Sequence, residues 1–349
     1  MALFEDARGL ADLFRAQARA RPDATAQVFG ERVSTYAMLD RRASQVANRL
    51  IALGARPGTR IGYLGKNSDL YFELLLGALK AKIVLVAVNW RLAPPEAATI
   101  LADAGVDILF VGAGFTDAAE AIAQAGHVTR HRIAMEGFAD WRGAEPKTDP
   151  MLPATPDDTV IQLYTSGTTG LPKGVELTNR NYLALLTAWE AAGFGDLGPA
   201  DVVLTCMPLF HVAGVNMGIL ALAYGCTNVV MEEVSVAGVL DLIARHRVTV
   251  TLLVPAVVLA LVQHPDAPRA NLRSLRRLLY GASPIAEDTV LRAKALLPGT
   301  ELWQLYGLTE TNGGGTYLPP CPARRTRREA PLLRATVPGL RVARRRTTR

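Results

Sequence analysis

Cysteine is scarce in this chain of 349 residues, which has only Cys206, Cys226 and Cys321. Three widely spaced cysteines predict neither a disulfide framework nor a metal site, and they fit a reducing cytoplasm, where we expect the protein to be. The five histidines are scattered, so a protein-bound zinc ion is not indicated. Every apolar run is broken before it reaches the length of a membrane span. Residues 1–23 lack the apolar core of a secretion signal and predict an amphipathic helix instead.

Positive charge is concentrated at one end of the chain. The formal net charge is +6, whereas residues 323–349 alone, with ten arginines and Glu329, have a charge of +9. Subtracting the charge of this tail leaves −3 for residues 1–322. A nucleic-acid-binding domain shows its basic surface on the folded part of the molecule. We therefore expect no nucleic-acid partner for the body of this protein.

Extended apolar segments alternate with segments of helical spacing along most of the chain. Half of the residues are hydrophobic, which is enough for a large core. The expected strands are residues 60–66, 83–89, 107–112, 159–165, 201–207, 227–232, 249–255, 275–281 and 301–307. The expected helices are residues 68–82, 94–105, 179–192, 213–224 and 236–247. This alternation predicts an α/β fold with two β–α–β-type subdomains, whose mostly parallel sheets are covered by helices.

A polar, proline-rich stretch divides the two halves of this pattern. It contains four prolines between residues 146 and 156, followed by two aspartates. We predict an N-terminal α/β subdomain at residues 1–145, a linker at 146–158 and a nucleotide-binding α/β subdomain at 159–318. Residues 319–349 are expected to form a basic, irregular tail.

The most informative segment is YTSGTTGLPKGV, residues 164–175, which follows an apolar run. It combines three glycines, four small hydroxyl side chains and Lys173. Glycines let the backbone approach a ligand closely, while N–H groups, hydroxyls and an ammonium bind anionic oxygens. The segment predicts a loop that binds nucleotide phosphates. The alternative is a flexible surface loop, which rarely has proline and lysine between glycines directly after a buried strand.

Spacing excludes three other motifs. A Walker loop needs a glycine followed by lysine and then serine or threonine, which does not occur in this segment. A dinucleotide fingerprint beginning at Gly112 fails because Asp117 stands at the third glycine position. A nucleophile elbow around Ser166 fails because Tyr164 stands at the first glycine position.

Five segments, taken in order, resemble motifs of the AMP-forming adenylating enzymes, which include the acyl-CoA synthetases. They are VNWRLAPPE at 88–96, YTSGTTGLPKGV at 164–175, MPLFHVAG at 207–214, YGASP at 280–284 and YGLTET at 306–311. The resemblance covers roughly residues 5–318. It implies an acid–CoA ligase, which uses ATP, Mg²⁺ and CoA to activate a carboxylic or fatty acid as an acyl-adenylate and then as an acyl-CoA.

The resemblance also implies roles for individual residues. The β- and γ-phosphates would bind Thr165, Ser166, Gly167, Thr168, Thr169 and Gly170. Adenine would lie between Gly281, Ala282 and Ser283 on one face and Tyr306 on the other. Catalytic roles fall on Lys173 beside the phosphates, Thr309 at the α-phosphate, Glu310 as the Mg²⁺ ligand and His211 at the wall of the acyl pocket. Taken alone, Tyr306 and His211 would more often be core residues, and Glu310 a solvated loop acid.

The resemblance nearly stops after Tyr317. The ribose-binding aspartate, the hinge and the C-terminal lid domain with its catalytic lysine are not found, and Asp196 comes too early in the chain to serve the ribose. Our hypothesis is a truncated or frame-shifted form with an incomplete barrel and weak turnover. A basic arm that binds nucleic acid or anionic lipid, and a genuine pseudoenzyme, are the alternatives for the tail.

Two further questions stay open at this stage. The enzyme alternative is a peptide-synthetase-type adenylation domain, and the non-enzyme alternative is a remnant that binds nucleotide or acyl groups. Small residues at Ala213, Gly214 and Gly218 favour room for a medium or long acyl chain. The identity of the acid and the oligomeric state are not determined by the sequence.

Overall fold

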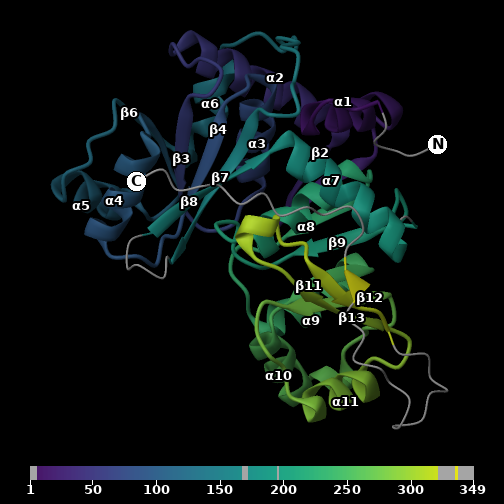
Figure 1. Ribbon diagram of the computed structural model, residues 1–349. Helices are drawn as coiled ribbons and strands as arrows, with labels where there is room; N and C mark the ends of the chain where they lie inside the picture. Colours follow the sequence, from purple (N-terminus) through teal and green to yellow (C-terminus); the bar gives the residue numbers. More distant parts are fainter. Residues whose placement is uncertain (1–5, 167–171, 195, 321–334, 337–349) are drawn as a thin grey trace.

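The computed structural model describes residues 6–166, 172–194, 196–320 and 335–336. Its strands form two mostly parallel sheets covered by helices, which confirms the predicted α/β fold class (Figure 1). Within these described residues, no helix combines the length and the apolar composition needed to cross a bilayer.

The first sheet has six strands in the order β6-β5-β3-β4-β7-β8. Its strands are β3 (Arg60–Leu64), β4 (Val84–Val88), β5 (Ile108–Val111), β6 (His131–Ala134), β7 (Thr159–Ser166) and β8 (Pro172–Thr178). All pairs are parallel except β7 with β8. Strands β4 and β5 are buried along their whole length, as continuous apolar runs in a sheet covered on both faces should be.

The second sheet has nine strands among the described residues, in the order β15-β14-β13-β12-β11-β9-β10-β1-β2. Its longer strands are β1 (Thr25–Phe29), β2 (Arg32–Thr35), β9 (Val202–Thr205), β10 (Thr227–Val230), β11 (Val250–Leu253), β12 (Arg277–Gly281) and β13 (Glu301–Tyr306). The short strands β14 (Thr316–Leu318) and β15 (Ala335–Thr336) lie at one edge. The centre of the sheet, from β1 to β13, is parallel.

Helices connect the strands and cover both sheets. They are α1 (Leu10–Ala20), α2 (Tyr36–Ala52), α3 (Asp69–Lys80), α4 (Pro94–Ala104), α5 (Thr116–Gln124), α6 (Phe138–Gly143), α7 (Asn179–Trp189), α8 (Val212–Ala223), α9 (Val236–His246), α10 (Pro255–Gln263) and α11 (Glu287–Leu296). Several begin at capping residues that the sequence supplies. Ser68, for example, accepts a hydrogen bond from the backbone N–H of Leu70, and Pro94 begins α4.

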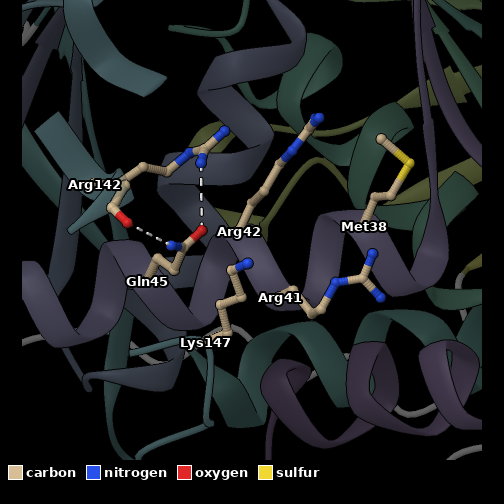
Figure 2. Close-up of a pocket in the computed structure, with 7 residues that line it drawn as sticks. Met38, Arg41, Arg42, Gln45, Arg142 and Lys147 are labelled. Carbon is tan, nitrogen blue, oxygen red and sulfur yellow. Dashed lines mark hydrogen bonds between the residues drawn. The ribbon is translucent and has the colours of Figure 1, made fainter. Parts of the chain in front are cut away.

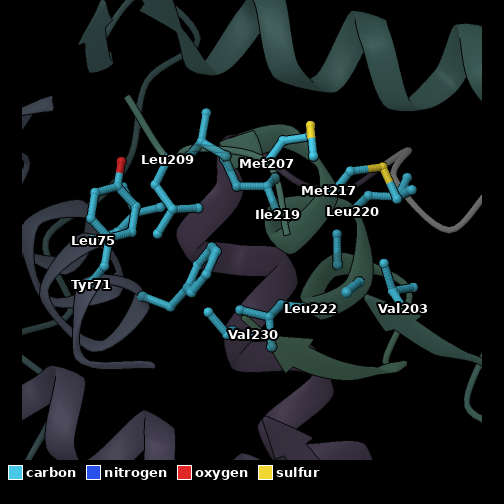
Figure 3. Packing of buried hydrophobic residues seen from close by; sticks show 14 of the residues in the cluster. Tyr71, Leu75, Val203, Met207, Leu209, Met217, Ile219, Leu220, Leu222 and Val230 are labelled. Carbon is cyan, nitrogen blue, oxygen red and sulfur yellow. The ribbon is translucent and has the colours of Figure 1, made fainter. Parts of the chain in front are cut away.

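The main core lies between α3, α8 and strands of the nine-stranded sheet (Figure 3). Tyr71 and Leu75 of α3 lie near Ile219 and Leu222 of α8 in this cluster. The approach is close because Gly218 has no side chain: a Cβ there would lie 2.0 Å from the ring of Phe72. This contact joins a helix of the first half of the chain to one of the second.

The two sheets do not divide the chain at residues 146–158. Strands β7 and β8 follow this stretch but belong to the six-stranded sheet, whereas β1 and β2 precede it but belong to the nine-stranded sheet. The stretch itself is anchored, because Asp149 accepts hydrogen bonds from Arg15 and forms an ion pair with Lys80. The subdomain boundaries proposed from the sequence stay a prediction.

Candidate active site

The described residues at both ends of the segment 164–175 are extended. Residues 164–166 end β7, and residues 172–175 begin β8, which runs antiparallel to β7. Thr165 lies opposite Lys173 in this pairing. Side chains directly opposite one another share a face of the sheet, so the hydroxyl and the ammonium lie on the same side. Gly167, Thr168, Thr169 and Gly170 lie outside the described residues.

The pairing of β7 with β8 corrects one detail of the sequence interpretation. Pro172, Lys173 and Gly174 were expected in a loop, but they are part of a strand. The strand accommodates proline because β8 is an edge strand. At Gly174 a Cβ would lie 2.3 Å from the side-chain amide nitrogen of Gln162, so a larger residue there would displace this amide.

One contact joins the two sheets at this point. The hydroxyl of Thr165 lies 3.4 Å from Oε1 of Glu310, within hydrogen-bonding distance. Glu310 is in the short 3₁₀ helix η4 (Thr309–Thr311), directly beyond the carboxyl end of β13. Two motifs that are 145 residues apart in the chain are therefore neighbours. Ligands of open α/β sheets bind beyond the carboxyl ends of parallel strands, which is where both lie.

A small cavity of about 60 Å³ is lined in part by the ends of β12 and β13 and by the residues that follow these strands. It is lined by Trp189, Val212, Ala213, Asn216, Met217, Leu252, Gly281, Ala282, Leu305, Gly307 and Gly313. None of these side chains is charged. Gly281 lies against the backbone of Leu305, because a Cβ would be 2.1 Å from that carbonyl oxygen. The lining is therefore uncharged, but the cavity is several times smaller than the roughly 300–1,000 Å³ of ordinary ligand sites.

The turn after β12 has an unusual backbone. Ala282 has a φ of 70°, in the left-handed region that side chains other than glycine rarely adopt. Residues in such conformations are concentrated at ligand-binding sites. Ser283, which follows, is exposed and is not among the residues that line the cavity.

Tyr306 ends β13 with half of its surface, 52%, open to solvent. A core role for this ring is therefore wrong, and an exposed aromatic ring is what a stacking role requires. Trp303, on the same strand, is buried. Thr309 is half-buried in η4 beside Glu310.

His211 is the residue directly before α8, whose first turn contributes Val212 and Ala213 to the cavity. It is exposed, but its ring packs against Phe210 at a centroid distance of 4.6 Å. Partial desolvation and the positive charge of Arg91 lower the pKa of the imidazole. The ring is therefore neutral at pH 7. The alternative interpretation, in which His211 is a buried core residue, is wrong.

The donor atoms near Glu310 fit magnesium. Among the described residues no three histidine, cysteine, aspartate or glutamate side chains come together as a metal site. Glu310 and the hydroxyl of Thr165 are hard oxygen donors. Magnesium is usually bound by one or two carboxylates together with water and substrate phosphates, so a single glutamate is sufficient if a nucleotide supplies the rest.

The sequence did not predict all of the residues that line the cavity, and two glycines that were expected to enlarge it do not. Gly214 and Gly218 do not enlarge the cavity: the space of the missing side chain is filled by the carbonyl of Pro208 and by the ring of Phe72. Trp189 and Asn216 were not predicted, and both line the cavity. The buried amide of Asn216 donates to the carbonyl oxygen of Asn312 at 2.9 Å. Their helical spacing indicates only that they are buried, not what they face.

Comparison with known proteins agrees with this geometry. Residues 14–342 match the family model described as AMP-binding enzyme. The fatty acid–[acyl-carrier-protein] ligase ScoC of Streptomyces coeruleorubidus is 38% identical over 306 residues, which cover 87% of this chain and 59% of ScoC. Feruloyl-CoA synthase of Amycolatopsis sp is 37% identical over 302 residues, which cover 85% of this chain and 59% of that enzyme.

Solved structures show the same architecture. The inhibitor-bound N-terminal domain of FACL13 from Mycobacterium tuberculosis superposes with a TM-score of 0.84 at 30% identity, covering 90% of this chain and 79% of that domain. The fold is therefore that of the N-terminal domain of an adenylating enzyme. The chain belongs to the AMP-binding enzyme family. It spans 59% of the length of the two relatives named above.

Proposed function

We propose that this chain binds ATP and a carboxylic acid, and that it does so as part of an AMP-forming acid–CoA ligase. The observation that supports this most directly is the 3.4 Å contact between Thr165 and Glu310, which brings the phosphate-binding segment and the YGLTET segment into one site. Membership of the AMP-binding enzyme family gives the reaction class. Fatty acids and aromatic acids are both candidate substrates, because relatives of both kinds match this chain.

In the proposed reaction, a carboxylate oxygen of the acid attacks the α-phosphorus of ATP. The bond from this phosphorus to the oxygen that bridges the α- and β-phosphates breaks, and pyrophosphate leaves with that oxygen and the electron pair. The products are an acyl-adenylate and pyrophosphate. A thiol then attacks the acyl carbon, giving a thioester and AMP. The first step brings anions together, so it depends on charge neutralisation and alignment.

We assign the following work to the residues of this chain. Lys173 and the hydroxyl of Thr165 bind the outer phosphates from one sheet, together with Ser166 and residues 167–170. Tyr306 stacks on adenine, opposite Gly281, Ala282 and Ser283, while Thr309 contacts the α-phosphate. Glu310 holds Mg²⁺, which neutralises phosphate charge when bound. Neutral His211 borders the acyl group without attracting its carboxylate.

The thiol acceptor has two candidates. CoA follows from the family resemblance and from the name of the feruloyl-CoA synthase relative. Acyl carrier protein is favoured by the name of ScoC, a fatty acid–[acyl-carrier-protein] ligase. Incubating the chain with ATP, an acid and either CoA or holo-acyl carrier protein distinguishes them by the thioester formed.

We place the reaction in the cytoplasm, in keeping with two free cysteines. Burial raises the pKa of Cys206 and of Cys226 to about 12, so both thiols stay protonated and inert.

Calorimetric titration with a non-hydrolysable ATP analogue and Mg²⁺ tests the proposal. We expect saturable binding of one analogue per chain, and a failure to bind would contradict the proposed site. Turnover is a separate measurement. Because the chain spans 59% of the length of its relatives, we expect these 349 residues alone to release pyrophosphate slowly. Pyrophosphate release at the rate of a full ligase would show that expectation to be wrong.

A further inference from the structure

A second pocket lies on elements that contribute nothing to the candidate active site. It has a volume of about 350 Å³ and is formed by α2 together with the end of α6 and the residues that follow it (Figure 2). Its lining residues are Met38, Arg41, Arg42, Gln45, Arg142, Gly143 and Lys147. Figure 2 shows four cationic side chains around one space. The volume is within the range of small-molecule sites.

The charge of this pocket is strongly positive. Arg142 donates to the carboxylate of Glu73, which is only 1% exposed, and Arg42 lies 3.8 Å from the other oxygen of the same carboxylate. One buried negative charge therefore serves two arginines. Arg41 and Lys147 have no acidic partner among the residues that the structure describes. Four cations and one anion give the pocket a net charge of +3, although residues 1–322 sum to −3.

The walls of the pocket are fixed by hydrogen bonds. The amide of Gln45, which is buried, donates to the carbonyl oxygens of Gly143 and Glu145 at 3.2 Å and accepts from Arg142 at 3.3 Å. Asn48, one turn further along α2, donates to the carbonyl oxygens of Pro146 and Thr148. These bonds fasten residues 143–148 to α2. The backbone on both sides of Lys147 is thereby held against α2, so little backbone freedom is lost when a ligand binds.

We propose that this pocket binds a phosphate-bearing anion, separately from the proposed adenylation site. One guanidinium group can donate hydrogen bonds to two oxygens of the same phosphate, and the lysine ammonium adds a compact positive charge. A dianionic phosphate or pyrophosphate group would supply the negative charge that Arg41 and Lys147 lack, and Met38 would pack against an apolar part of the compound that carries it. A free phosphate compound and a phospholipid headgroup share this chemistry. The inference does not rest on the proposed function.

The test uses two exposed side chains whose loss leaves the fold intact. Arg41→Gln with Lys147→Gln removes two positive charges from the pocket. Arg132→Gln with Lys294→Gln removes the same charge from exposed positions elsewhere and is the control. Thermal unfolding of all variants checks that each is folded. Binding of inorganic pyrophosphate is measured by calorimetry at low and at physiological ionic strength.

We expect the pocket variant to bind pyrophosphate about tenfold more weakly for each charge removed, and the control to bind like the wild type. Lys173→Gln should weaken pyrophosphate binding at the proposed adenylation site only. Loss of binding at one site can therefore be distinguished from loss of binding at the other. Vesicles with and without phosphatidic acid form a second arm. Vesicle binding that is lost in the pocket variant, without binding of free pyrophosphate, identifies the headgroup as the source. Equal affinity of pocket variant and control for both probes would overturn the proposal.

Discussion

Glu310 is the residue on which the proposed metal site depends. It is exposed and lies beside the hydroxyl of Thr165, so its replacement should leave the fold unchanged. Glu310→Gln removes the charge that attracts Mg²⁺ but keeps the size of the side chain. An interaction with a charged group contributes about 1.5–3 kcal/mol, so affinity for the magnesium–nucleotide complex should fall about tenfold to a hundredfold.

Titration of wild type and Glu310→Gln with the ATP analogue, with Mg²⁺ and with a chelator, measures this effect. The difference between them should vanish without the metal. Glu287→Gln, an exposed carboxylate on α11, is the matched control. Equal loss of affinity in both metal conditions would mean that Glu310 contacts the nucleotide without Mg²⁺.

Residue identities predict chemistry better than they predict neighbours. The sequence alone indicates that Glu310 and Thr165 serve one ligand, because each stands in a motif. Gly218 shows the opposite case. A glycine on an apolar helix is compatible with an open pocket or with a close helix contact, and only packing decides: here the ring of Phe72 fills the space. Pocket residues such as Trp189 and Asn216 depend on the same long-range contacts.

At the scale of elements, Gly218 of α8 leaves the space that the ring of Phe72 of α3 fills. A methyl group there would overlap this ring, which is fully buried. Overpacking of this kind typically costs about 1–3 kcal/mol, so we expect Gly218→Ala to lower the free energy of unfolding by about that amount. Denaturant titration measures the change. Gly137→Ala, where a Cβ meets nothing within 4 Å, should be nearly neutral. Similar stability of both variants would show that the helices can separate at little cost.

Asp149 connects α1 to α3. It forms ion pairs at 2.8 Å with Arg15 and with Lys80, which is almost completely buried. Burial alone would raise the pKa of this carboxyl, but the two cations outweigh it and hold the pKa well below the usual range. Because the folded pKa is lower than the unfolded one, the stabilisation is present above about pH 4 and is lost as the pH falls further.

We expect Asp149→Asn to cost about 3 kcal/mol at pH 7, since it leaves buried cations without this partner. The difference in the free energy of unfolding between Asp149→Asn and the wild type should become smaller below about pH 4. Unfolding curves between pH 3 and pH 7 test both statements. Asp157→Asn breaks an exposed pair with Arg180 in the same segment and should change stability by less than about 1 kcal/mol. If the stability difference between Asp149→Asn and the wild type stays constant with pH, the ion pairs of Asp149 do not have the role assigned to them.

Helices and strands with a clear hydrophobic pattern were predictable from the sequence. Strands that depend on pairing with distant segments were not. The apolar runs around β4, β5 and β11 and the helices α3, α4 and α9 occur where the sequence predicts them. Strand β8 is polar at its start, and it becomes a strand because β7 offers it an edge. Strand β1 pairs with β10, about 200 residues away in the chain. Neither local spacing nor composition indicates such pairings.

For the whole molecule, the candidate site lies where the two sheets meet. Thr165 and Lys173 come from the six-stranded sheet, whereas Tyr306 ends strand β13 of the nine-stranded sheet and Glu310 follows that strand. A ligand that contacts all four therefore stabilises both sheets at once. At a concentration one hundred times its dissociation constant, the ATP analogue should raise the free energy of unfolding by about 2.7 kcal/mol.

Amide hydrogen exchange distinguishes this coupling from binding at one sheet alone. With the analogue and Mg²⁺ bound, exchange should slow both in β7 and β8 and in residues 306–316, because opening either segment would break contacts to the ligand. The two effects should appear at the same analogue concentration. In Glu310→Gln with Mg²⁺ present both effects should weaken, whereas Glu287→Gln should behave like the wild type. Slower exchange confined to one sheet would mean that the nucleotide does not bridge the two motifs.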